Sequence, residues 1–164
     1  MAITTDDVKA LRDQTGVSVM QCKKALEEAD GDREKALTIL RKVSGDIAGK
    51  KATRALGAGT VAAYVHSTKT IASLVMLSSE TDFVAKNEEF VKLAYDIAMQ
   101  VAATNPQFLS RTEAPGETPP EHILLEQSFI KDPARNVREL IEAATQKFGE
   151  RIEVAKFVRL TTSE

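Results

Sequence analysis

The sequence predicts an α+β protein: a bundle of three helices, then a mostly antiparallel sheet of about three strands packed with helices. Over roughly the first 45 residues, apolar positions recur at helical spacing and glycines divide them into three short segments. From residue 57 onward, runs rich in β-branched residues alternate with helical patterns. These observations divide the chain into a helical domain (1–44), a linker (45–56) and an α+β core (57–164).

Each helix of the first domain has a recognisable start. Thr4 is a good N-cap for the first helix. Ser18 begins the second and has Gln21 at the third helical position, which is a capping box. Asp32 caps the third helix after a Gly turn. Three short helices of this kind bury only a modest core, so we expect a small domain of limited stability on its own.

The predicted linker carries a cluster of basic residues. Helical periodicity is lost after residue 44, and Gly45 and Gly49 favour a linker, part of which could be helical. A solvated helix end is the simplest interpretation of the charges, and a contact with phosphate or an acidic partner is the alternative. The cluster consists of Arg41, Lys42, Lys50, Lys51 and Arg54.

The core begins with two predicted strands. Residues 60–66 and 71–77 are separated by a short turn and favour a hairpin. A helix is expected from about Asn87, and further helices from Thr118 and from Asp132–Pro133. The predicted order is ββαααβ. In the last strand, Ile152, Val154, Val158 and Leu160 are expected on one side and Phe157 on the other.

Residues 81–87 form a corner between the second strand and the helix that follows it. This corner places an acid, Asp82, beside an aromatic residue, Phe83. Asp82 could cap a local helical turn, and Phe83 could pack into the core. Alternatively, an exposed Phe beside an acid at a rigid corner is typical of a protein-binding hot spot.

Composition excludes several classes of protein. The 164 residues carry a net charge of −2, too small to indicate nucleic acid or membrane as a bulk partner. Cys22 is the single cysteine, so no internal disulfide can form and a reducing cytoplasm is expected. The first residues resemble neither a signal nor a transit peptide, and no apolar run has the length of a membrane span.

Catalytic and metal-binding patterns are weak. His66 and His122 are far apart in different predicted elements, so no metal site and no cofactor are expected. Cys22 lies on the apolar face of its helix and is expected in the core. Glu80 and Asp82 could form a carboxylate pair, but no pocket pattern accompanies them. We therefore expect no catalytic residues.

Two separate motifs resemble the signatures of the bacterial translation elongation factor Ts family. The first is Thr81-Asp82-Phe83-Val84-Ala85-Lys86-Asn87. The second is Leu11-Arg12-Asp13-Gln14-Thr15-Gly16 followed by Met20-Gln21-Cys22-Lys23-Lys24-Ala25-Leu26. Shorter similarities occur at Tyr64-Val65-His66, Lys131-Asp132-Pro133 and Gly149-Glu150-Arg151-Ile152. The resemblance covers nearly the whole chain in the right order.

The resemblance implies a guanine-nucleotide exchange factor for elongation factor Tu, with a first domain similar to a ubiquitin-associated (UBA) domain. The factor is expected to bind no nucleotide, nucleic acid or metal itself. Dislocation of the partner's Mg²⁺ is implied for Thr81, Asp82, Phe83 and Val84. Partner binding is implied for Leu11, Arg12, Thr15, Gly16, Met20, Lys23, Lys24, Ala85, Lys86 and Asn87.

The length adds a further expectation. Long family members carry a second core half, and this chain has room for one half only. We therefore expect a homodimer through the core sheet or its covering helices. Two other functions remain open: a UBA-type adaptor without exchange activity, and a small enzyme that uses Glu80, Asp82 or His66 in a deep pocket.

Overall fold

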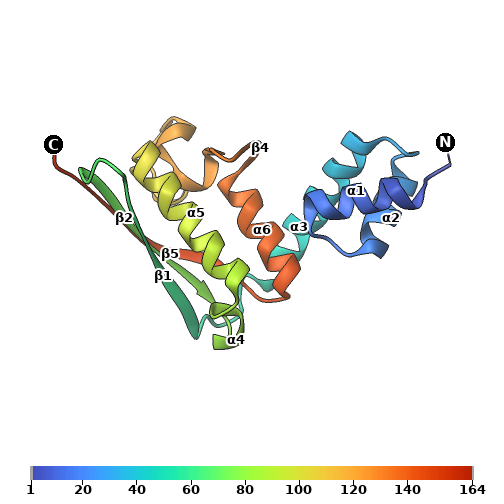
Figure 1. Cartoon of the computed structure of the whole chain (residues 1–164), viewed down its shortest axis with the longest axis horizontal. Coiled ribbons are helices and arrows are strands. Elements are labelled where there is room, and N and C mark those ends of the chain that lie inside the picture. Colours follow the sequence, from blue (N-terminus) through green and yellow to red (C-terminus); the bar gives the residue numbers. More distant parts are fainter. Residues whose placement is uncertain (1, 164) are drawn as a thin grey trace.

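The computed structural model describes residues 2–163, in which a helical bundle and an α+β core are joined by one long helix. In Figure 1 the bundle lies at one end, and the core sheet lies at the other with its strands side by side. This arrangement confirms the predicted α+β class. The sheet has the strand order β1-β2-β5, and both of its strand pairs are antiparallel.

The bundle consists of helices α1 (Thr5–Thr15), α2 (Val19–Glu28) and α3 (Arg33–Lys51). All three predicted caps are present, because the side chains of Thr4, Ser18 and Asp32 accept from backbone N–H groups of the first turns. The helices bury one apolar cluster between them. Its members are Val8, Leu11, Val17, Cys22, Ala25, Leu26, Ala29, Ala36, Leu37 and Leu40.

Helix α3 continues to Lys51 and so passes through much of the segment predicted as a linker. Only residues 52–57 lie outside helices and strands before the core begins. The two glycines favoured a linker, but Ile47 is partly buried and α3 packs against α6 (Val137–Phe148). Packing of this kind overrides a weak helix propensity. The exact domain boundary stays a prediction.

The basic cluster anchors the end of α3 to the core. Lys51 Nζ donates to the carbonyl oxygen of Gly149 at 3.0 Å. The guanidinium of Arg54 lies 3.5 Å from the carboxylate of Glu80. Two of the five basic residues therefore link segments that are distant in the sequence, a role that neither sequence interpretation included.

The sheet contains β1 (Ala58–Val65), β2 (Ile71–Ser79) and β5 (Glu153–Thr161). Helix α5 (Glu88–Thr104) packs along its inner face. The core between sheet and helices includes Val75, Leu77, Phe90, Ile97, Val101 and Val154. The predicted hairpin and the helix after Asn87 are thus both confirmed.

Two predicted helix starts were wrong. The segment after Thr118 forms only two short 3-10 turns, η1 (Pro120–His122) and η2 (Leu124–Glu126). Asp132 begins strand β4 (Asp132–Asn136), which pairs with β3 (Ser128–Phe129). Helix α6 starts only after Asn136, whose side chain forms a capping box with Glu139. The stronger cap, four residues later, sets the start of the helix.

The facing predicted for the last strand was also wrong. Ala155 has no partner in the pairing of β5 with β2, so the strand contains a bulge. Because side chains alternate along a strand, one extra residue reverses every position beyond it. Val154 and Phe157 consequently face the core, while Val158 and Leu160 point outward and are 50% and 73% exposed.

Candidate functional site

The corner after β2 is a short helix, α4 (Asp82–Ala85), that displays an aromatic side chain. Phe83 is 87% exposed, whereas Val84 and Ala85 are each 5% exposed and join the main core cluster. The alternative in which Phe83 packs into the core is therefore wrong. One side of α4 anchors the turn in the core, and the other presents Phe83 to solvent.

Thr81, rather than Asp82, caps this turn. The hydroxyl oxygen of Thr81 accepts from the N–H of Val84 at 3.5 Å, and Asp82 occupies the first helical position with an exposed side chain. An acid at the first turn interacts favourably with the helix dipole, but a single turn makes this effect small. Lys86 ends α4, and Asn87 caps α5 by accepting from Glu89 N–H at 2.9 Å. Both are exposed.

Two carboxylates tie the corner to the turn between α6 and β5. The carboxylate of Glu150 accepts from the backbone N–H groups of Glu80 at 3.1 Å and Thr81 at 2.9 Å, and from the Thr81 hydroxyl at 2.7 Å. In return, the carboxylate of Glu80 accepts from the backbone N–H of Arg151 at 2.8 Å. This hydrogen bond, aided by the charge of Arg54, lowers the pKa of Glu80.

These hydrogen bonds show that the carboxylates of Glu80 and Glu150 hold two neighbouring turns together. The sequence left Glu80 open as one of a carboxylate pair for acid–base chemistry, whereas its carboxylate accepts from the backbone of the turn before β5. No role was assigned to Glu150 from the sequence, although the acid follows directly after the glycine that ends α6. The position of Glu150 directly after a glycine that ends a helix was the one feature of the sequence that could have indicated its role.

The second set of candidate residues lies on the bundle. Arg12, Met20, Lys23 and Lys24 are exposed, and Met20 is 82% exposed. An exposed Met flanked by lysines offers apolar contact within a positively charged rim. Three further candidates, Leu11, Thr15 and Gly16, have structural roles within the bundle. Leu11 is fully buried, Thr15 is half-buried and donates to the carbonyl of Leu11 at 2.7 Å, and Gly16 ends α1 with a φ of 70°.

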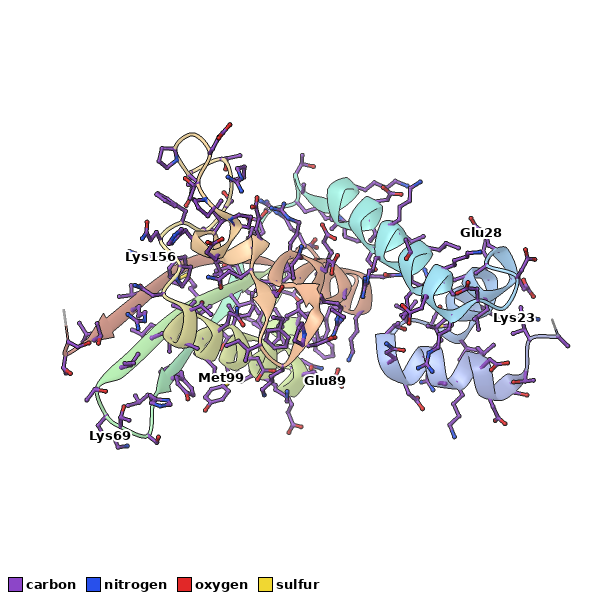
Figure 2. The ribbon with its side chains drawn as sticks, turned by 90° about the horizontal axis from the view of Figure 1, so that it is seen from above. Lys23, Glu28, Lys69, Glu89, Met99 and Lys156 are labelled. Atoms are coloured by element: carbon purple, nitrogen blue, oxygen red, sulfur yellow. The ribbon has the colours of Figure 1, made fainter. Side chains whose placement is uncertain are left out.

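The two sets of residues do not form one site. In Figure 1, α4 lies at an end of the sheet, well away from α1 and α2. Figure 2 shows Lys23 on the bundle at one end of the molecule and Lys69, in the turn between β1 and β2, at the other end. The bundle is held by contacts of α3 and α2 with α6, where Gln146 donates to Gln21 at 2.9 Å and accepts from Ser44. A partner that touched both surfaces would have to span the molecule.

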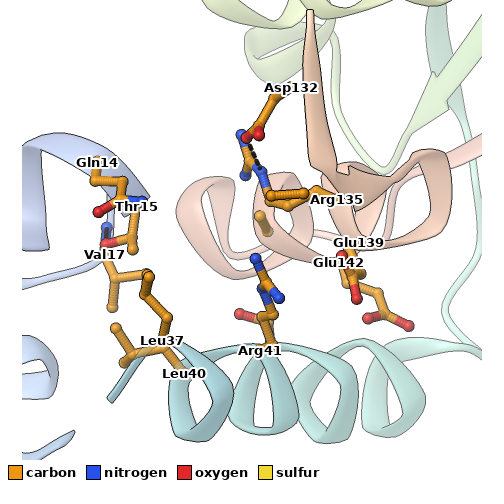
Figure 3. A pocket seen from close by; sticks show the side chains of 13 residues that line it. Gln14, Thr15, Val17, Leu37, Leu40, Arg41, Asp132, Arg135, Glu139 and Glu142 are labelled. Atoms are coloured by element: carbon orange, nitrogen blue, oxygen red, sulfur yellow. Dashed lines mark hydrogen bonds and ion pairs between the residues drawn. The ribbon is translucent and has the colours of Figure 1, made fainter. Parts of the chain in front are cut away.

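A pocket lies between the bundle and the core (Figure 3), lined from α1, α3, β4 and α6. Three of its ionisable groups have structural partners: Arg135 pairs with Asp132 at 2.8 Å, and Glu139 accepts from the Asn136 N–H at 3.2 Å. Burial raises the pKa of Glu142, which lies against Gly45 of α3. The enzyme alternative relied on Glu80, Asp82 and His66, none of which lines this pocket.

The remaining residues considered for catalysis or metal binding lie in separate parts of the fold. Tyr64 Oη and His66 Nδ1 are hydrogen-bonded at 3.1 Å, and His122 lies in η1. Cys22 is buried in the bundle core, as predicted. Within residues 2–163, no group of three His, Cys, Asp or Glu side chains is arranged to hold a metal ion. No helix in that range is long and apolar enough to cross a membrane.

The outer face of the sheet is apolar and uncovered by any described element (Figure 1). Its side chains come from all three strands, because cross-strand partners share a face of the sheet. Two charged residues of β5 share this face: Lys156, paired with Met76, and Glu153, paired with Ser78. The large members, 42–73% exposed, are Val61, Val65, Leu74, Met76, Val158 and Leu160.

Comparison with known proteins decides the family. The family model described as "Elongation factor TS" matches residues 9–120, which include most of α1, all of α2 and the Phe83 corner. The elongation factor Ts of Thermodesulfovibrio yellowstonii is 41% identical over 196 aligned residues, covering 100% of this chain and 98% of that protein. The chain belongs to the elongation factor Ts family.

Other elongation factor Ts proteins give the same result. That of Thermosipho melanesiensis is 42% identical, covering 96% of this chain and 97% of its own length. That of Acetivibrio thermocellus is 40% identical over 99% of this chain and 91% of its own length. Membership in the elongation factor Ts family assigns the chain to translation elongation, and it confirms the resemblance in the two sequence motifs.

Proposed function

We propose that this protein is a guanine-nucleotide exchange factor for elongation factor Tu and acts without a catalytic site of its own. The observation that carries the proposal is the presentation of Phe83, 87% exposed on a turn whose neighbouring residues are buried. An exposed aromatic side chain on a fixed backbone can enter a partner without the entropy cost of ordering a loop. Asp82, beside it, brings a negative charge to the same place.

Exchange follows from linkage between two ligands of the partner. A factor that binds nucleotide-free elongation factor Tu more tightly than the GDP form must weaken GDP binding by the same factor. We propose that Phe83 wedges between side chains of the partner while Asp82 disturbs the groups that hold its Mg²⁺. Thr81 and Val84 fix the turn in this mechanism, and Lys86 and Asn87 border the contact.

The exposed residues of the bundle supply a second contact in this proposal. Met20, Lys23, Lys24 and Arg12 form a surface separate from α4. Two contacts on one rigid molecule raise the affinity of each, because the second binding event becomes intramolecular. Leu11 and Ala85 are buried, so they support these surfaces from within. The factor would work in the cytoplasm, together with the rest of the translation machinery.

We propose in addition that two copies of the chain associate through the outer face of the sheet. Six large apolar side chains are exposed there, an arrangement typical of protein interfaces. The paired positions of this face carry one acid, Glu153, and one base, Lys156, so two copies can meet about a two-fold axis without a row of like charges between them. This assigns the expected homodimer to the sheet and not to its covering helices.

Release of a fluorescent GDP analogue from elongation factor Tu tests the proposal. The exchange factor should accelerate release in proportion to its concentration and then saturate. A UBA-type adaptor would bind through the bundle but leave the release rate unchanged. Binding of elongation factor Tu without acceleration would therefore favour the adaptor over the exchange factor.

A further inference from the structure

We propose that Glu150 is a positioning residue for exchange, acting through Thr81 to hold the Phe83 corner in its active geometry. This inference rests on the proposed exchange function and extends it to a residue outside the corner. Glu150 is 69 residues away from Thr81 in the sequence, and its carboxylate accepts three hydrogen bonds from Glu80 and Thr81. A carboxylate that accepts several N–H and O–H groups forms strong, directional contacts.

The Thr81 hydroxyl links Glu150 to the start of α4. This group has a single proton, and it donates that proton to Glu150 at 2.7 Å. The lone pairs of the hydroxyl oxygen are then free to accept from the N–H of Val84, and this hydrogen bond caps α4. Glu150 therefore determines the orientation of the hydroxyl that starts the turn carrying Phe83.

Glu150 also holds the backbone at the entrance to the corner. Glu150 Oε1 accepts from two consecutive N–H groups, those of Glu80 and Thr81, just where β2 ends. Ser79 holds the same segment from the strand side by donating to the carbonyl of Thr81 at 3.0 Å. The backbone immediately before Asp82 is thus fixed by side chains on both sides.

Glu150 is itself positioned by the glycine that precedes it. Gly149 ends α6 in a left-handed conformation with a φ of 71°, which turns the chain so that the next residue points at the corner. The carbonyl of Gly149 accepts from Lys51 at the end of α3. The helix that carries the bundle and the turn that carries Phe83 therefore meet at Gly149 and Glu150.

The test uses Glu150→Gln in the full chain, with Glu153→Gln as the matched control. A glutamine can still accept the two N–H groups through its oxygen, but its NH₂ group cannot accept the Thr81 hydroxyl proton. Glu153 carries the same charge three residues later, and its contact is an ion pair with Arg151 at 2.6 Å. The probe is release of a fluorescent GDP analogue from elongation factor Tu at increasing concentrations of the factor.

We expect Glu150→Gln to lower the maximal release rate about tenfold, as for loss of one hydrogen bond to a charged group. The half-saturating concentration should stay within about twofold, since the bundle contact is untouched. Thr81→Val should cause a similar loss, and the double variant should be no worse than either single one. Glu153→Gln should keep the wild-type maximal rate.

A wild-type maximal rate in Glu150→Gln, or losses that multiply in the double variant, would overturn the role of Glu150. Amide hydrogen exchange at Val84 provides a readout independent of activity, and Glu150→Gln should accelerate it. If wild-type protein did not speed GDP release, the proposed function would fail first. Faster exchange at Val84 would then still support the restraint of the corner by Glu150, and unchanged exchange would overturn it.

Discussion

Phe83 and Val84 are consecutive residues of one helical turn, yet Phe83 is 87% exposed and Val84 is 5% exposed. The contrast separates the two tasks of the corner, since Val84 fastens it to the core and Phe83 is free to bind. Changes at the two positions should therefore affect different properties of the protein.

Phe83→Ala should change the free energy of unfolding by less than about 0.5 kcal/mol, because the ring is already exposed in the folded protein and buries little apolar area. Val84→Ala should cost about 1–3 kcal/mol, because it leaves a cavity beside the core. Urea denaturation followed by circular dichroism measures both values. A large loss of stability in Phe83→Ala would mean that the ring packs against the protein.

The continuity of α3 can be tested at its glycines. At Gly49 an added Cβ would meet no atom within 4 Å, so Gly49→Ala should stabilise the protein by about 0.5 kcal/mol. Gly59 provides the contrast, because its added Cβ would lie 2.8 Å from the Leu77 carbonyl oxygen. Thermal unfolding should show a gain for Gly49→Ala and a clear loss for Gly59→Ala. A loss at Gly49 would indicate a break in the helix.

Association through the sheet can be tested with a charge on its outer face. Leu74→Glu and Leu160→Glu should each give a monomer, because two copies would bury unpaired charges against apolar side chains. Ile130 is 45% exposed at a different surface, so Ile130→Glu is the matched control and should leave the dimer intact. Size-exclusion chromatography with light scattering gives the mass. A wild-type monomer at tens of micromolar would contradict the proposal.

The contact between α3 and α6 should respond to pH through Glu142. Burial raises the pKa of this carboxyl above the ordinary value of 4.5, so the folded state holds the proton more tightly than the unfolded state. Its contribution to stability therefore falls as pH rises from about 4.5 through the folded pKa. Glu142→Gln should stabilise the protein at pH 7 by a few tenths of a kcal/mol, since the group is partly solvated.

The measurement is thermal unfolding of Glu142→Gln and wild type from pH 4 to pH 7. The difference between them should grow with pH and nearly vanish at the acid end. Glu117→Gln, at an exposed glutamate, should show no such trend. A difference that is the same at every pH would show that the charge of Glu142 has no part in it.

Local patterns predicted much of this fold. The caps at Thr4, Ser18 and Asp32 were correct, because each depends only on a few neighbouring residues. The end of α3 was not predictable from its glycines, because packing against α6 decides it. The bulge at Ala155 left no local signal, and it reversed the facing of Val158.

At the candidate site, too, local features were predictable from the sequence and features decided by packing were not. The sequence predicted a corner with Asp82 and Phe83, and hydrophobic pattern alone left the exposure of Phe83 open. Whether Phe83 is exposed depends on which residues of the turn pack into the core, and in the structure these are Val84 and Ala85. Glu150 could not be linked to Thr81 by spacing, because the contact exists only once α6 and β5 are in place.

Release of a fluorescent GDP analogue from elongation factor Tu, with wild type and Phe83→Ala compared in stopped flow, tests the central claim most directly. Wild type should accelerate release, and Phe83→Ala should lower the maximal rate by about tenfold or more, as expected for a hot-spot aromatic residue. Asp82→Ala should also reduce it. A folded Phe83→Ala variant that releases GDP as fast as wild type would contradict the account.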